Sequence, residues 1–155
     1  MPLLRAALSW NFVLATAICA SLMAQLIKVL LNLFIFHRFI AERMWGAGGM
    51  PSSHSATVCA MVVATGRYCG VNSPIFAIAA VLSIIVMYDA MGVRYETGEQ
   101  AKVLNRMFTE WMDQGFEQFQ LPHGKKLMEM VGHTPIEVVT GAALGIVLGF
   151  AMRMV

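Results

Sequence analysis

Four long apolar stretches, separated by polar junctions, dominate the pattern of the chain. They cover residues 7–36, 55–68, 73–93 and 134–155. A helix that crosses the hydrocarbon core of a bilayer needs about 20 mostly apolar residues. The pattern therefore predicts about four transmembrane helices, of which the second is short and open to shielding by its neighbours.

A polar region at residues 94–132 separates the third and fourth apolar stretches. Its first part, residues 98–119, brings apolar side chains near one helical side: Val103, Met107, Trp111 and Met112. Charged residues occupy much of the remaining surface, which is typical of an amphipathic helix at a membrane surface. We therefore expect an all-α integral membrane helix bundle with one additional interfacial amphipathic helix.

The composition supports a membrane protein and excludes other classes. Of 155 residues, 58% are hydrophobic and 13% are charged, against roughly a quarter charged in soluble domains. The length fits a single domain over residues 1–155. A net charge of +2 without a basic block argues against a nucleic-acid partner. The three cysteines show no spacing typical of a disulfide framework or a zinc site.

Four crossings would bring the polar junctions to one membrane face. That face would carry most of the cations: Arg38, Arg43, Arg94, Lys102, Arg106, Lys125 and Lys126. The opposite face would carry little beyond Arg5, Arg67 and Arg153. Because lysine and arginine concentrate in cytoplasmic loops, we expect the shared face to be the cytoplasmic one, in a bacterial cytoplasmic membrane.

Lys28 is an ionisable residue inside the first apolar stretch, where insertion into a bilayer is costly. It shares one helical side with Ser21, Gln25 and Asn32. The spacing favours a polar stripe that faces an internal site, although a lysine that extends to the headgroups is the simpler alternative.

The junction GGMPSSHSA (48–56) has the residues of a helix start that can bind an anion. Proline and serine favour the first turn and the N-cap, and the free N–H groups of a helix N-terminus attract anions. The preceding glycines let backbone approach a ligand. His54 can donate a proton to a leaving oxygen there, or it can simply be an interfacial histidine in a capped loop.

His133 and Glu137 lie four residues apart at the start of the last apolar stretch. The carboxylate can fix the tautomer and orientation of the imidazole and raise its nucleophilicity. Three glycines continue along the same side at 141, 145 and 149, which predicts close packing against a neighbouring helix. A surface histidine beside a snorkelling glutamate is the alternative for the pair.

Asp89 and Arg94 form a further polar cluster, in YDAMGVR (88–94). An aspartate near the end of an apolar helix is costly unless it is paired. Arg94 can pair with Asp89 or bind a phosphate bidentately. Two histidines, several cations, a helix N-terminus and an oriented carboxylate together suggest phosphoryl chemistry.

PSSHSA (51–56) and GHTPIEVVTGAALG (132–145) resemble motifs of the type 2 phosphatidic acid phosphatase superfamily. With GGMPSSHSA, YDAMGVR and EQAKVLN (99–105), nearly the whole chain resembles its small divergent bacterial and plant branch. The resemblance implies that Ser52 binds phosphate and that His54 is the general acid, with Ser53 in place of a glycine.

The same resemblance implies that His133 is the nucleophile and that Glu137 stands in place of the family's aspartate. Lys28 corresponds to the family's upstream lysine, although no Arg-Pro follows it. Leu127 occupies the position of an arginine six residues before the nucleophile. Arg94 is our first candidate to supply that charge, followed by Lys125 and Lys126.

We therefore expect a membrane lipid phosphatase that hydrolyses a phosphomonoester or a pyrophosphate through a phosphohistidine, without a metal or other cofactor. Its expected partners are a lipid phosphate and the bilayer, and a homo-oligomer is left open. Two other classes stay open. A small transporter or channel would use intramembrane charges along an ion path, and a non-catalytic lipid-phosphate-binding protein would keep the anion site without needing His133.

Overall fold

The computed structural model describes residues 11–36, 49–113, 126–129 and 132–153. It contains these helices: α2 (Phe12–Phe36), α4 (Ser53–Cys69), α5 (Pro74–Met91), α6 (Val93–Asp113) and α7 (Pro135–Ala151). The described part of the chain has no strand. The predicted all-α class and the positions of the apolar helices are therefore confirmed.

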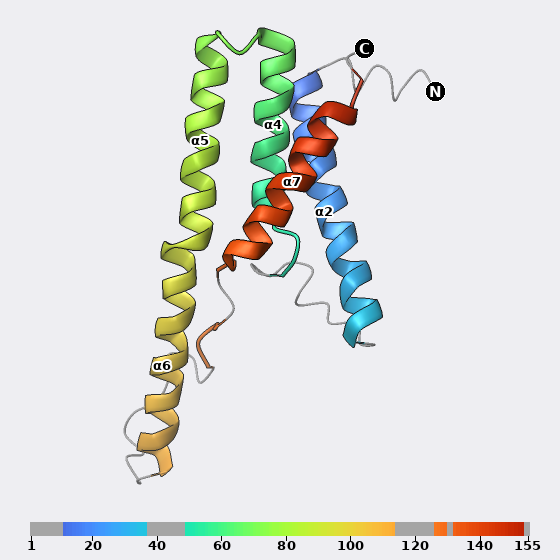
Figure 1. Cartoon of the computed structure of the whole chain (residues 1–155). Coiled ribbons are helices and arrows are strands. Elements are labelled where there is room, and N and C mark those ends of the chain that lie inside the picture. Colours follow the sequence, from blue (N-terminus) through green and yellow to red (C-terminus); the bar gives the residue numbers. More distant parts are fainter. Residues whose placement is uncertain (1–10, 37–48, 114–125, 130–131, 154–155) are drawn as a thin grey trace.

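Helix α4 is the centre of the bundle. It packs against α2, α5 and α7, and α7 also contacts α2. Figure 1 shows that α2 and α5 run in one direction while α4 and α7 return. The starts of α4 and α7 therefore lie near the end of α5 and beside α2. This is the order of crossings that the sequence predicted.

Large apolar side chains face outward and small ones fill the interior of the bundle. Ala20, Ala24, Ala56 and Ala60 form the buried core cluster, whereas outward residues such as Ile78 are 68% exposed. A soluble protein rarely exposes so much apolar surface, but helices packed through small residues in lipid do. The packing therefore confirms a helical membrane bundle.

Two of the described helices are long and apolar enough to span a bilayer, within Phe12–Phe34 and Pro74–Trp111. Helices α4 and α7 have 17 residues each. At about 1.5 Å per residue they are roughly 26 Å long, which is at the short end of the spanning range.

The three glycines of α7 set its close approach to α4. A Cβ atom on Gly141 would collide with the carbonyl oxygen of Ser52, and one on Gly145 would collide with that of Ala56. At Gly149 it would lie 2.7 Å from Val63 Cβ. The predicted glycine-lined contact is confirmed, and it places the start of α7 beside the start of α4.

Helix α6 is the predicted amphipathic helix, and it begins five residues earlier than its predicted segment. It continues from α5 in nearly the same direction and extends beyond the bundle (Figure 1). Only Gly92 interrupts the two helices, and its carbonyl already accepts a hydrogen bond from Glu96 N at 3.0 Å. Because helical hydrogen bonding begins again at Gly92, α6 keeps nearly the direction of α5.

Candidate functional site

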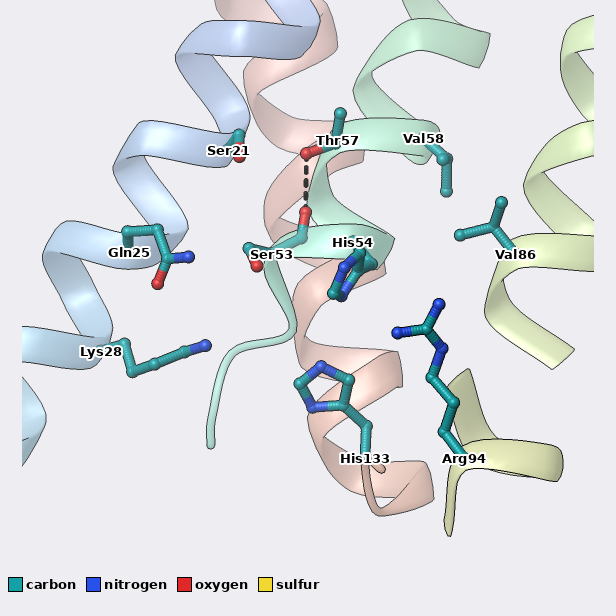
Figure 2. Close-up of a pocket in the computed structure, with 10 residues that line it drawn as sticks. All are labelled: Ser21, Gln25, Lys28, Ser53, His54, Thr57, Val58, Val86, Arg94 and His133. Carbon is teal, nitrogen blue, oxygen red and sulfur yellow. Dashed lines mark hydrogen bonds between the residues drawn. The ribbon is translucent and has the colours of Figure 1, made fainter. Parts of the chain in front are cut away.

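A pocket of about 450 Å³ lies between α2, α4 and the end of α5. Its lining comes from α2, α4, the adjoining ends of α5 and α6, and the segment before α7 (Figure 2): Ser21, Gln25, Lys28, Ser53, His54, Thr57, Val58, Val86, Arg94 and His133. The lining thus includes two histidines and two cations, which the fold brings together from α2, α4, α6 and the segment just before α7.

Two backbone hydrogen bonds hold the pocket together. Ser52 N donates to Glu137 O at 2.9 Å, which joins the start of α4 to the start of α7. His133 N donates to Ala90 O at 3.0 Å, which joins the segment before α7 to the end of α5. The chain at Gly132 packs so closely on the first residues of α6 that any Cβ would collide with backbone there.

His133 is 2% exposed and has two distinct ring nitrogens. Its Nδ1 lies 3.0 Å from Glu137 Oε2, and the same oxygen accepts a hydrogen bond from Thr134 N at 3.1 Å. Its Nε2 is buried and has no hydrogen-bond partner in the described part of the chain. When Nδ1 carries the proton and donates to Glu137, Nε2 presents a lone pair to the pocket.

The imidazole of His54 lies across the pocket from that of His133. The two ring centroids are 5.8 Å apart, and the rings meet edge to face. Figure 2 shows His54 above His133, with Lys28 on one side and Arg94 on the other. A small anion placed among these groups would have nitrogen atoms on several sides.

Lys28 and Arg94 supply positive charge from opposite walls. Lys28 is 3% exposed and forms no ion pair with a described residue. Gly49 covers its aliphatic part, because a Cβ there would lie 3.4 Å from Lys28 Cδ. Arg94 donates from Nε to Asp89 Oδ2 at 2.7 Å, which leaves its two terminal amino groups for the pocket (Figure 2).

Ser52 lies elsewhere than expected. It is the N-cap of α4 and is fully buried. Its Oγ accepts from Ser55 N at 3.4 Å and is 3.2 Å from Ser55 Oγ, so it faces the helix end instead of the pocket. Ser53, one residue later, lines the pocket. The N–H groups of Ser53 and His54 belong to the first turn, which has no helical partner for them.

The remaining predicted residues are either partners of pocket residues or alternatives to Arg94 as the source of positive charge. Asp89 and Glu137 are not part of the lining, but Asp89 accepts a hydrogen bond from Arg94 and Glu137 is hydrogen-bonded to His133. Lys126 is exposed and is not part of the lining, and Lys125 lies outside the described residues. Within the described ranges, no group of three His, Cys, Asp or Glu side chains could hold a metal ion.

Asn105 is a structural residue that sequence reasoning missed. It is 5% exposed, and its Nδ2 donates to Leu127 O at 2.9 Å and to Glu129 Oε1 at 2.8 Å. Its Oδ1 accepts from Leu127 N at 2.9 Å. These bonds fix the segment that leads to His133. The available signal was a polar residue on the otherwise apolar helical side of Ala101 and Phe108. Thr57, Val58 and Val86 of the lining were also missed, because nothing in their sequence context distinguishes them.

The fold and the pocket define a helical membrane protein with two histidines and two cations in one site. The model of the family described as the Divergent PAP2 family matches residues 9–148, and the chain belongs to this family. The predicted resemblance to a divergent branch of the type 2 phosphatidic acid phosphatases is therefore confirmed.

The chain is also similar to the uncharacterized membrane protein YuiD of Bacillus subtilis (strain 168). The two are 38% identical over 144 residues, which cover 89% of this chain and 91% of the relative. No solved structure matches the chain.

Proposed function

We propose that the protein is a membrane lipid phosphatase that hydrolyses a phosphomonoester or a pyrophosphate through a phosphohistidine. One observation carries the proposal. A buried imidazole, His133, has Nδ1 held by a carboxylate while Nε2 is left without a partner among the described residues and faces a pocket flanked by cations. This arrangement is that of an oriented nucleophile.

In the first step, His133 Nε2 attacks phosphorus and forms a P–N bond. The bond between phosphorus and the leaving oxygen breaks, and protonated His54 gives that oxygen a proton. The Nδ1–H group of His133 donates a hydrogen bond to Glu137, and this carboxylate stabilises the positive charge on the ring. The products are the dephosphorylated leaving group and a phosphohistidine.

In the second step, a water molecule attacks phosphorus and neutral His54 accepts its proton. The P–N bond breaks, inorganic phosphate leaves, and His133 regains its lone pair. His54 therefore acts first as an acid and then as a base, and both histidines return to their initial protonation states.

Cations and fixed donors stabilise the negative charge of the transition state. Lys28 and Arg94 approach from opposite walls, and the hydroxyl group of Ser53 lies in the lining. The first N–H groups of α4 add the positive end of a helix. Such prearranged donors act strongly in a site that excludes water.

The placement of charge favours this proposal over an ion path. A transporter or channel would spread ionisable residues through the depth of the membrane, whereas the pocket gathers Lys28, His54, Arg94 and His133 at one level. The excess of lysine and arginine that the sequence predicts for this face supports an active site on the cytoplasmic face of a bacterial cytoplasmic membrane.

The test is phosphate release by the purified protein from a panel of lipid monophosphates and diphosphates. The wild type should release phosphate from at least one lipid, and His133→Ala should retain less than a few per cent of that rate while unfolding at a similar temperature. His123→Ala is the matched control, because the mechanism gives that histidine no role. A His133→Ala protein with near-normal turnover would refute the mechanism.

A further inference from the structure

We infer that the α2 wall of the pocket, formed by Gln25 and Ser21, is a subsite for a hydroxyl group that the substrate carries next to its phosphate. The inference rests on the proposed function for the phosphate itself. It goes further by defining a substrate class, namely lipid phosphates with a hydroxyl-bearing carbon close to the phosphoester oxygen.

The subsite lies beside the cations and extends away from them. Lys28, Gln25 and Ser21 all line the pocket from α2. At about 1.5 Å per residue, Gln25 is roughly 4.5 Å and Ser21 roughly 10.5 Å from Lys28 along the helix axis. Figure 2 shows the three in this order on one wall, with His133 at the Lys28 end. A substrate whose phosphate contacts Lys28 and His133 would therefore place its next atoms beside Gln25.

Gln25 has an unmet hydrogen-bonding need. Its Oε1 is buried, and no described residue donates a hydrogen bond to it. Buried polar atoms of this kind are rare in folded proteins, because losing water without gaining a partner is costly. A ligand hydroxyl group would supply the missing donor.

Beyond Arg94, the opposite wall is apolar. Val58 of α4 and Val86 of α5 line it, and the described parts of α2 and α5 pack on α4 without contacting each other. A ligand between these walls meets hydrogen-bonding groups on one side and hydrocarbon on the other. Thr57 belongs to the polar side, where its hydroxyl group donates to Ser53 O at 2.7 Å and keeps its lone pairs free to accept.

This division of the walls discriminates between lipid classes. A glycerol phosphate with a single acyl chain carries a free hydroxyl group near the phosphoester oxygen and the acyl chain further away, so both walls find a partner. A polyprenyl or simple alkyl phosphate has only hydrocarbon at that position, and it would leave Gln25 buried and unsatisfied. A site built to bind a hydroxyl group rejects the analogue that lacks it.

The experiment compares 1-oleoyl-glycerol 3-phosphate with its 2-deoxy analogue, which differs by one hydroxyl group. The wild type should show a kcat/KM about tenfold higher for the hydroxylated lipid, as expected for one buried hydrogen bond. Gln25→Met keeps the length of the side chain but removes both polar atoms. It should bring the ratio close to one, mainly by slowing the hydroxylated substrate. Leu22→Ala, on the outward face of α2 where Leu22 is 66% exposed, should leave the ratio unchanged.

Two results would overturn the inference. One is a wild type that does not distinguish the two lipids, and the other is a Gln25→Met protein that slows both lipids equally. If the wild type hydrolyses neither lipid, the subsite is judged by binding, and the proposed function fails only if no other lipid of the panel releases phosphate either. The hydroxylated lipid should raise the unfolding temperature of the His133→Ala protein more than the deoxy lipid does. The difference should disappear when Gln25→Met is added, and equal stabilisation would reject the subsite.

Discussion

Replacing Arg94 tests whether this residue is a catalytic cation or only anchors the helix. Its ion pair with Asp89 has an Nε–Oδ2 distance of 2.7 Å, and the two side chains are 50% and 42% exposed. Pairs this exposed contribute about 0–1 kcal/mol to folding. Arg94→Ala should therefore fold almost normally.

The expected effect on turnover is much larger. If the terminal amino groups of Arg94 contact the transferring phosphoryl group, their loss should slow kcat about 100- to 1,000-fold, or roughly 2.7–4 kcal/mol in the barrier. Arg94→Lys should not restore the rate. A lysine has a single compact ammonium group, whereas arginine can bond Asp89 through Nε and still present two amino groups to phosphate.

The assay is steady-state phosphate release by Arg94→Ala and Arg94→Lys, with unfolding temperatures measured in parallel. Arg106→Ala is the matched control, because Arg106 also lies on α6 but is 83% exposed and pairs with Glu110 away from the pocket. The control should keep normal turnover. Near-normal rates for both Arg94 variants would refute the assignment, and a severe defect in the Lys125 or Lys126 variant would transfer the role to that lysine.

Four further outcomes are expected. His54→Ala should be severely slowed in phosphate release, but less so for substrates with good leaving groups, which need less protonation. Gly145→Ala should lower the free energy of unfolding by about 1–3 kcal/mol, because the added methyl group collides with Ala56 O, whereas the outward-facing Val147→Ala should change it little. Asn105→Leu should lower kcat more than it raises KM, because it frees the segment before His133 without touching substrate. Activity should survive treatment with EDTA; near-total loss that a divalent ion restores would contradict a metal-free mechanism.

Local patterns predicted much of the fold. The apolar stretches predicted the positions of the helices. The spacing of Gly141, Gly145 and Gly149 predicted which face of α7 packs closely against a neighbour. The spacing of His133 and Glu137 also predicted their contact, but the reason is different: His133 lies just before α7, and Glu137, at the third helical position, reaches back to it and to Thr134 N. These features depend only on residues close together in the sequence.

The features that sequence reasoning missed depend on contacts between distant segments or on a shift of one residue. PSSH predicted a helix start, but the exact N-cap decides whether Ser52 or Ser53 faces the pocket. The bonds of Asn105 to Leu127 and Glu129 join segments 22 and 24 residues apart. The catalytic and binding roles of the site residues stay predictions until they are measured.

The most direct test of the central claim is rapid quenching of the protein with a lipid substrate that carries ³²P in the transferred phosphoryl group. The wild type should acquire protein-bound label that is stable to alkali and labile to acid, as a P–N bond is, and peptide mapping should place it at His133. His133→Ala should acquire none. A wild type that turns over substrate without forming this label, or that carries it on another residue, would contradict the account.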